Sequence, residues 1–255
     1  MKVVIVMTYF ERPYQLTKTL ESLKSSHHRD FEVIVVDDCS KVNMATHNIT
    51  EYPVTILRTE NKRWINPEPA YNTGLYYAMK QKPDIIIVQN AECYHVGDVI
   101  SYAERVTDET YISFGCFSLD EKTTFHEHNI IELLQKHTNR ANNDGELAWY
   151  NHPKYRPCAY DFCIAITAKN MKKLNGYDER FSTGWAYGDN YLLARVKMLG
   201  LRVEITETPL VVHQWHYNQP VPPDSVRLNA RNLLLYQSLI KKPNYRAEHI
   251  YTENL

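Results

Sequence analysis

Four short runs of the chain consist almost entirely of valine, isoleucine and other apolar residues. They lie at positions 3–7, 31–36, 54–57 and 85–88. Between the first two runs, Leu16, Leu20 and Leu23 recur at helical spacing. Residues 72–80 show a second helical pattern ahead of the fourth run. A strand that is apolar at every position is buried on both faces, so we expect an α/β fold with a mostly parallel sheet between helices.

The second half of the chain is less regular but still predicts ordered elements. Asn142-Asn143-Asp144-Gly145 is a strong turn signal. The elements expected after it are a strand over 162–167, a helix from about 169, a helix over 190–199, a strand over 201–212 and a helix over 225–240. Pro220, Pro222 and Pro223 precede the last helix. We expect this tail either to pack on the domain or to mediate a homodimer.

The composition argues against several classes of function. The 255 residues carry a net charge of −1, so binding to a nucleic-acid backbone has no electrostatic support. No apolar run approaches the length needed to span a bilayer, and the first residues lack a signal-peptide pattern. Five scattered cysteines form no zinc-like pairs and indicate reduced thiols. We therefore expect a soluble, cytoplasmic protein without an integral membrane segment.

Two acidic residues follow the second apolar run. Asp37 and Asp38 stand at the carboxyl end of residues 31–36, and ligands of open α/β sheets bind beyond such strand ends. A carboxylate at this place can accept hydrogen bonds from a nucleobase N–H or a ribose hydroxyl. One of the two acids could instead cap the next segment, so the pair alone leaves both roles open.

Candidate cation ligands follow two other expected strands. Asn90 and Glu92 come after the run at 85–88 and point to the same side of an extended chain. Such oxygen ligands suit Mg²⁺ or Mn²⁺, which also bridge phosphate oxygens. His213 and His216 follow the late strand, and a neutral imidazole can complete a metal shell. A simple turn after the strand, and a pair of core or surface histidines, are the alternatives.

The segment Gly184-Trp185-Ala186-Tyr187-Gly188-Asp189 joins aromatic rings to an acid at the start of a helix. Trp185 and Tyr187 offer flat faces that suit a sugar ring. Asp189 is either an N-cap of the helix or a general base whose pKa is tuned by the aromatic surroundings. Its position in the sequence does not decide between these roles.

Taken in order, these segments resemble the GT-A fold glycosyltransferases of family 2, which are inverting sugar transferases. The segments that carry the resemblance are VIVMTYFERP (4–13), EVIVVDDCS (32–40), AYNTG (70–74), NAE (90–92), GYDERF (176–181), GDNYLLAR (188–195) and His213. The resemblance implies a Rossmann-like GT-A domain over 1–217, with a nucleotide-binding half at 1–93 and an acceptor half at 94–217. Residues 218–255 would form a C-terminal extension with a helix.

The resemblance implies that a nucleotide-diphosphate sugar, with UDP favoured, binds across the strand ends. The residues assigned to the donor are Thr8, Tyr9, Glu11, Arg12, Asp37, Asp38, Asn72 and Asn90. Asp38 would hold the ribose, and Asn72 would contact the base or the diphosphate region. Trp185 and Tyr187 would line the side of the acceptor, which is a glycan or glycoconjugate.

A divalent cation, Mn²⁺ or Mg²⁺, is also implied, with Glu92 and His213 as ligands and Asn90 in contact through water. His216 is the alternative imidazole. Asp189 would take the proton of an acceptor hydroxyl while that oxygen attacks the anomeric carbon from the face opposite the leaving group. A single displacement of this kind inverts the anomeric carbon.

Three departures from the family pattern favour a different reading. Asn90 and Glu92 replace two aspartates, Tyr71 replaces an arginine, and Gly188 replaces the glutamate before Asp189. The changes in the metal motif favour the main alternative, a GT-A-like domain with weakened catalysis that binds a nucleotide or a glycan, whereas the retained Asp189 and His213 argue against it. A nucleotidyltransferase is a third class, but it needs a glycine-rich phosphate loop, and the loop after the first strand contains no glycine.

Overall fold

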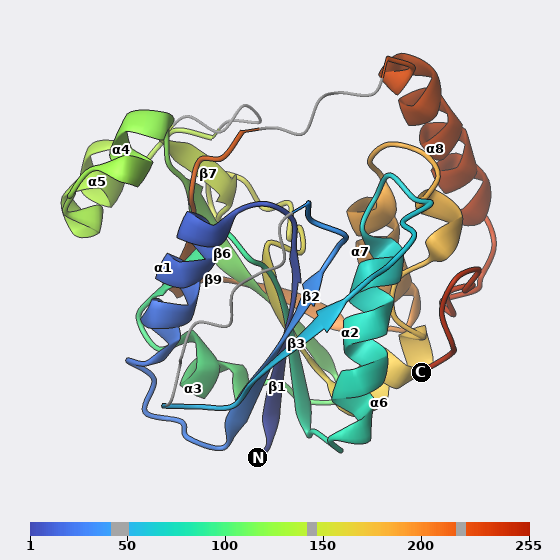
Figure 1. Ribbon diagram of the computed structural model, residues 1–255, viewed down its shortest axis with the longest axis horizontal. Helices are drawn as coiled ribbons and strands as arrows, with labels where there is room; N and C mark the ends of the chain where they lie inside the picture. Colours follow the sequence, from blue (N-terminus) through green and yellow to red (C-terminus); the bar gives the residue numbers. More distant parts are fainter. Residues whose placement is uncertain (42–50, 142–146, 218–222) are drawn as a thin grey trace.

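The computed structural model describes residues 1–41, 51–141, 147–217 and 223–255 (Figure 1). The strands are β1 (Val3–Tyr9), β2 (Phe31–Asp37), β3 (Val54–Arg58), β4 (Ile85–Asn90), β5 (Cys93–Val96), β6 (Thr110–Ser118), β7 (Ala148–Asn151), β8 (Cys163–Thr167) and β9 (Arg202–His213). Within the described ranges they form one sheet in the order β3-β2-β1-β4-β8-β6-β9-β5, with β7 paired to β6. The turn expected at 142–145 and the prolines at 220 and 222 lie outside the described residues.

Helices cover both faces of this sheet. They are α1 (Pro13–Leu23), α2 (Glu68–Lys80), α3 (Val99–Ala103), α4 (Glu121–Phe125), α5 (Ile130–Lys136), α6 (Ala168–Leu174), α7 (Gly188–Met198) and α8 (Ser225–Leu239), with a 3₁₀ turn η1 (Glu179–Phe181). The first face carries α1 and α3, and the second carries α2, α6 and α7 (Figure 1). Among the described residues, no helix combines the length and the apolar character needed to cross a membrane.

Alternate residues of β1 serve two different cores. Ile5 and Met7 pack with the leucines of α1, whereas Val4 and Val6 pack with α2 and α6. Successive side chains of a strand point to opposite faces, so a strand between two helical layers must be apolar throughout. The unbroken apolar runs of the sequence therefore mark the central strands, and the expected α/β fold, with a sheet between two helical layers, is confirmed.

The registers of the sheet bring several strand ends to one edge. In the parallel part, β3-β2-β1-β4, Tyr9 pairs with Asp37 and Thr8 pairs with Asn90. The rest of the sheet is mixed: β8 is antiparallel to β4 and to β6, whereas β9 is parallel to β6. Strand β9 is also antiparallel to β5, and this pairing sets His213 opposite Cys93. The late histidine therefore arrives beside the residue that follows Glu92.

Helix α2 begins earlier than the expected range of 72–80. It starts at Glu68, after Pro67 at the N-cap and with Pro69 in the first turn. Proline is tolerated there because the first N–H groups of a helix have no partner within the helix. Farther along α2, a Cβ at Gly74 would lie 2.5 Å and 2.9 Å from valine methyl groups of β1 and β2. The glycine thus lets the helix pack closely on the sheet.

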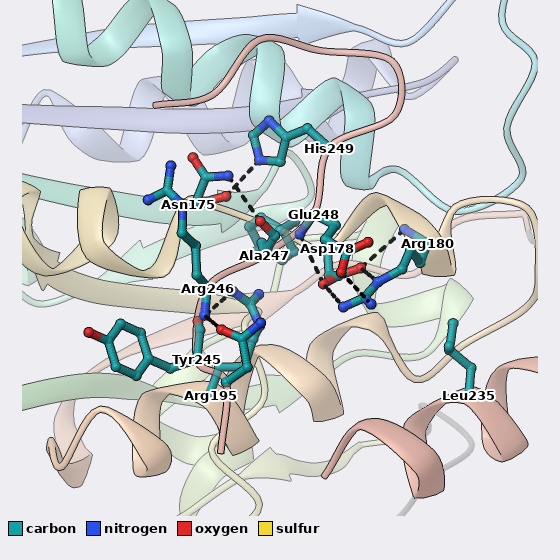
Figure 2. A network of polar contacts seen from close by, with 12 residues as sticks. Asn175, Asp178, Arg180, Arg195, Leu235, Tyr245, Arg246, Ala247, Glu248 and His249 are labelled. Atoms are coloured by element: carbon teal, nitrogen blue, oxygen red, sulfur yellow. Dashed lines mark hydrogen bonds and ion pairs between the residues drawn. The ribbon is translucent and has the colours of Figure 1, made fainter. Parts of the chain in front are cut away.

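The C-terminal segment after α8 returns to the body of the domain. Figure 2 shows it against the loop that follows α6, where the Asn175 amide donates to the Ala247 carbonyl at 3.0 Å. Arg180 forms an ion pair with Glu248 at 2.8 Å. The buried guanidinium of Arg195 donates to three backbone carbonyls, one of them in the C-terminal segment. The segment is therefore part of the folded domain.

Candidate functional site

Two neighbouring cavities open at the edge where β1 and β4 end. The first, the carboxyl cavity, has a volume of about 320 Å³ and is lined by Thr8, Arg12, Asn66, Pro67, Glu68, Tyr71, Asn90, Glu92, Asp161, Phe162, Tyr177, Ala186, Gly188 and Asp189. The second, the Trp185 cavity, has a volume of about 370 Å³ and is lined by Thr8, Tyr9, Phe10, Arg12, Asp38, Lys62, Ile65, Asn66, Pro67 and Trp185. Four lining residues are common to both, so the cavities adjoin.

Glu92 and two histidines form a candidate cation site. The Oε1 atom of Glu92 lies 3.4 Å from Nε2 of His213 and 3.6 Å from Nε2 of His216. One ligand atom from each of the three residues lies within 4.8 Å of the other two. Both histidines that the sequence left as alternatives therefore reach the same carboxylate.

The chemistry of this donor set fits a divalent cation. A carboxylate with two imidazoles suits Mn²⁺ better than Mg²⁺, which prefers oxygen ligands. Nδ1 of His216 lies 3.1 Å from the carbonyl oxygen of Tyr217, and donation to that oxygen leaves Nε2 with a free lone pair. Burial lowers the pKa of His213, against the opposing effect of Glu92, and favours the neutral imidazole that binds metals.

Arg12 already neutralises this carboxylate. Its Nη1 donates to Glu92 Oε1 at 2.7 Å. Burial alone would raise the pKa of Glu92, but the charge of Arg12 and the hydrogen bonds of the two histidines hold it well below its usual value. Asn90, the other residue of the expected metal motif, accepts a hydrogen bond from the Tyr71 hydroxyl at 2.8 Å. Glu92 is therefore ionised, with a cation on one of its oxygens.

Three other carboxyl groups of the carboxyl cavity have the opposite electrostatic character. Burial raises the pKa of Glu68 to about 8, and the charges of Asp161 and Asp189 add to this effect. Burial and the charge of Asp189 raise the pKa of Asp161 to about 7, although the Tyr177 hydroxyl donates to it at 2.6 Å. Burial also raises the pKa of Asp189. We call Glu68, Asp161 and Asp189 the acid group.

Asp189 lies in the first turn of α7, and the N-cap position is Tyr187. The N-cap alternative for Asp189 is therefore wrong. In the described part of the chain, its Oδ1 accepts a hydrogen bond from the backbone N–H of the next residue, Asn190, at 2.7 Å. The carboxyl group is thus placed on the cavity lining without a side-chain partner of its own in the described part of the chain.

Asp38 is held at the Trp185 cavity by three side-chain donors, the first of which is the Thr59 hydroxyl at 3.2 Å. The Lys62 ammonium donates to it at 2.6 Å, and the Trp64 indole donates at 3.0 Å. The ring of Trp64 packs against Tyr251 of the C-terminal segment, with centroids 5.5 Å apart. Trp185 lines this cavity together with Asp38, whereas the family resemblance implied a place on the acceptor side. The carboxylate is therefore oriented by the segment that follows β3, which the C-terminal segment supports through Trp64.

Two acids expected at the donor site point elsewhere. Asp37 is buried and pairs with Arg58 at 2.5 Å. Glu11 accepts a hydrogen bond from the backbone N–H of Lys41 at 2.9 Å. Neither acid lines the carboxyl cavity or the Trp185 cavity. Both brace the loops around β1 and β2, which positions Asp38 between them.

Asn72 and Tyr187 also lie away from the two cavities. The Asn72 amide donates to the Tyr177 carbonyl and accepts from the Tyr177 N–H, each at 2.8 Å, and it also donates to Glu179 at 2.9 Å. These bonds leave it no free group for a base or a diphosphate. Tyr187 packs on Tyr236 of α8, with ring centroids 5.9 Å apart. The structure thus assigns both to internal packing.

The sequence patterns missed Glu68 and Asp161. Glu68 had a usable signal, because the segment Asn66-Pro67-Glu68-Pro69 marks a helix start and puts an acid in its first turn. Asp161 had none: it reaches the cavity because β8 lies antiparallel beside β4, where the Phe162 carbonyl accepts from the Asn90 N–H at 3.0 Å. That pairing joins segments about seventy residues apart and cannot be read from either one.

Comparison with known proteins agrees with this architecture. The chain matches Glycosyl transferase family 2 over residues 3–164. An uncharacterized glycosyltransferase of Haemophilus influenzae is 36% identical over 59 residues, which are 23% of this chain and 20% of that protein. The matching segment thus spans only about a fifth of that curated relative.

Solved glycosyltransferases have the same fold at low sequence identity. TarS 1-349 of S. aureus, solved in complex with UDP, has a TM-score of 0.64 and 14% identity over 98% of this chain and 68% of its own. The mannosyltransferase PcManGT of Pyrobaculum calidifontis, with GDP-Man and Mn²⁺, has a TM-score of 0.60 and 16% identity over 94% of this chain and 64% of its own. GalNAc-T7, with UDP, GalNAc and Mn²⁺, has a TM-score of 0.60 and 15% identity over 94% of this chain and 49% of its own. The chain belongs to glycosyl transferase family 2 and has the GT-A fold.

Proposed function

We propose that the chain is an inverting glycosyltransferase. It transfers a sugar from a nucleotide-diphosphate sugar, with UDP favoured, to a hydroxyl of a glycan or glycoconjugate acceptor. The donor preference is supported by UDP in the similar TarS and GalNAc-T7 structures, beside GDP-Man in PcManGT. Mn²⁺ or Mg²⁺ assists the reaction.

One observation carries the proposal: the carboxylate of the candidate cation site lines the same cavity as an acid that has no side-chain partner among the described residues. Glu92, with His213 and His216 beside it, provides the first. Asp189 of α7 provides the second. A cation held by Glu92 and the histidines would neutralise the charge that develops on the departing diphosphate. Asp189 would act on the acceptor hydroxyl.

The chain's own residues then divide the reaction between the two cavities. Asp38, oriented by Lys62, accepts hydrogen bonds from the ribose in the Trp185 cavity. Asp189 takes the proton of the acceptor hydroxyl as the new C–O bond forms and the bond to the diphosphate breaks. A raised pKa makes its carboxylate a stronger base once it is ionised. Displacement from the face opposite the leaving group inverts the anomeric carbon.

A specific contact favours the second candidate, a domain that binds a nucleotide without efficient transfer. Arg12 donates to the same Glu92 oxygen that the two histidines approach. A guanidinium at that place repels a cation and can itself neutralise a diphosphate. In this candidate function, Arg12 takes over the electrostatic role of the metal.

Incubation with a panel of nucleotide sugars, with and without Mn²⁺, tests both candidates. The proposed transferase should release nucleoside diphosphate slowly in the presence of Mn²⁺, and faster with a glycan acceptor. Analysis of the product by NMR should show the anomeric configuration opposite to that of the donor. Tight UDP binding with no release of diphosphate from any donor would favour the binding domain and reject the transferase.

A further inference from the structure

Glu68 is a buried acid of the carboxyl cavity that the proposed reaction does not yet use. It is the first residue of α2 and is only 3% exposed. Its Oε1 lies 3.4 Å from the side-chain amide nitrogen of Asn66, and its Oε2 has no hydrogen-bond partner among the described residues. A buried polar atom without a partner costs free energy and is uncommon in native proteins. The burial of Glu68 with one oxygen unpartnered in the described structure therefore calls for an explanation.

The carboxyl group of Glu68 fills the space that a side chain at Gly188 would occupy. A Cβ built on Gly188 would lie 2.0 Å from Glu68 Oε1 and 3.1 Å from its carboxyl carbon. The φ of Gly188 lies outside the left-handed region, so its backbone does not itself require glycine. Glycine is thus present because Glu68 reaches this point from α2.

This position is next to the proposed base. Gly188 directly precedes Asp189 on α7, and Gly188, Asp189 and Glu68 all line the carboxyl cavity. The Glu68 carboxyl therefore stands where a side chain from residue 188 would otherwise begin. The chain supplies an acid beside Asp189 from a helix about 120 residues earlier.

We propose that Glu68 is an acceptor-binding residue whose carboxyl group hydrogen-bonds a hydroxyl of the sugar that reacts at Asp189. The inference rests on the proposed function and adds a named contact for its acceptor. A bound hydroxyl supplies the partner that Oε2 lacks in the described structure. Glu68 forms no covalent bond in the reaction and holds the acceptor beside the base.

The protonation state supports a neutral, polyhydroxylated ligand. Because burial raises the pKa of Glu68 to about 8, the group is largely protonated at pH 7. A protonated carboxyl has one O–H donor and a carbonyl acceptor, which matches the donor and acceptor of a sugar hydroxyl. The nearby Asp161 and Asp189 disfavour an anionic ligand on the same side of the cavity.

The first test separates acceptor binding from structural support. Glu68→Met keeps the volume and removes the buried polar group, so the melting temperature should not fall. The acceptor KM for a panel of p-nitrophenyl glycosides should rise about tenfold, the usual effect of one lost hydrogen bond. Glu68→Gln, which retains a donor and an acceptor, should stay within about threefold of wild type. Glu109→Gln, on the exposed residue before β6, is the matched surface control.

The second test moves the carboxyl group from position 68 to position 188. Gly188→Glu alone should lose acceptor binding because its Cβ collides with Glu68. Glu68→Ala combined with Gly188→Glu should bring the acceptor KM back to within about fivefold of wild type, whereas Glu68→Ala combined with Gly188→Ala should not. An unchanged acceptor KM in Glu68→Met, or no difference between the two double variants, overturns the inference.

A binding measurement keeps this inference distinct from the proposed function. Ligand-observed NMR can detect p-nitrophenyl glycosides on the wild-type protein and on Glu68→Met, without any turnover. Loss of this binding in Glu68→Met, with no transfer by the wild type from any nucleotide sugar, would reject the transferase and keep the glycan contact. Transfer by the wild type with equal glycoside binding in both proteins would keep the transferase and reject the role of Glu68.

Discussion

Carboxyl groups are in opposite electrostatic states in the Glu92 group, which is Glu92 with Arg12, His213 and His216, and in the acid group. Glu92 faces Arg12, His213 and His216, and its pKa is held well below the usual range despite its burial. In the acid group, which is Glu68, Asp161 and Asp189, burial dominates and raises every pKa. The neighbours of each carboxyl group on this cavity thus determine its pKa. A low pKa suits a group that binds a cation, and a raised pKa suits a group that exchanges protons near neutral pH.

The difference indicates how the cavity divides its work. A carboxylate that stays ionised suits a cation and the diphosphate that accompanies it. Carboxyl groups with raised pKa values suit hydroxyl groups and proton transfer near neutral pH. Substitutions in the Glu92 group should therefore mainly change the binding of metal and nucleotide, and substitutions in the acid group should mainly change acceptor binding and turnover.

The largest effect should come from Asp189→Asn. The amide cannot take a proton, so turnover should fall about a hundredfold or more, the usual size of a general-base contribution. Nucleotide-sugar affinity, measured by calorimetry, should remain near that of the wild type, because the donor contacts lie on other segments. Asp108→Asn, at an exposed ion pair with Lys169, is the control. Turnover equal to that of the wild type would remove Asp189 from the role of base.

Glu92→Ala should mainly affect the binding of metal and nucleotide. It removes the only carboxylate of the described Glu92-His213-His216 cluster, so the affinity for UDP in the presence of Mn²⁺ should fall roughly ten- to a hundredfold. Because both imidazoles approach Glu92 at similar distances, His213→Ala and His216→Ala should weaken Mn²⁺ binding to a similar extent. Calorimetric titrations that give equal affinities for wild type and Glu92→Ala would exclude Glu92 from the cation site.

Arg12→Gln tests whether the guanidinium beside Glu92 competes with a cation. Removal of the guanidinium frees the Glu92 oxygen and removes a like charge from the cation site. The affinity for Mn²⁺ alone should therefore rise roughly three- to tenfold. Titration of Mn²⁺ without nucleotide measures this change, and a lower affinity would show that Arg12 supports the site instead of competing with the metal.

The sequence predicted the local parts of the fold better than the distant pairings. The apolar runs located β1 to β4. The elements β8, α7, β9 and α8 lie within two residues of their expected bounds, and α6 begins one residue before its expected start. Strands β5, β6 and β7 were missed, because their polar and aromatic residues are buried by partners far along the chain. The pattern of apolar residues shows which faces of a strand are buried when burial follows from the strand's own sequence. The burial of β5, β6 and β7 depends instead on the strands that pair with them.

The same limit applies to the site. Asn90 was singled out because it follows a strongly patterned strand, Thr8 and Arg12 were assigned through the family resemblance of the first loop, and all three line the carboxyl cavity. Asn72 looked equally suitable, but the loop after α6 occupies its amide. Competition for a polar side chain by another segment leaves no local trace in the sequence. Asp161 was missed for the converse reason, since β8 delivers it from outside the predicted pattern.

The smallest predicted effect concerns the pH dependence of stability. The raised pKa of Glu68 has the opposite direction to the lowered pKa of Glu92. In the folded protein the pKa of Glu68 is raised to about 8 from an ordinary value of 4.5, so the folded state keeps this proton over a range in which the unfolded chain has lost it. The contribution of Glu68 to stability is therefore fully present below about pH 4.5 and is lost as the pH rises through about 8. Between pH 6 and 8.5 the free energy of unfolding should fall, and Glu68→Gln should reduce that fall by on the order of 1 kcal/mol. Urea unfolding at the two pH values measures the change, and an identical pH dependence in wild type and Glu68→Gln would show that Glu68 ionises normally in the folded protein.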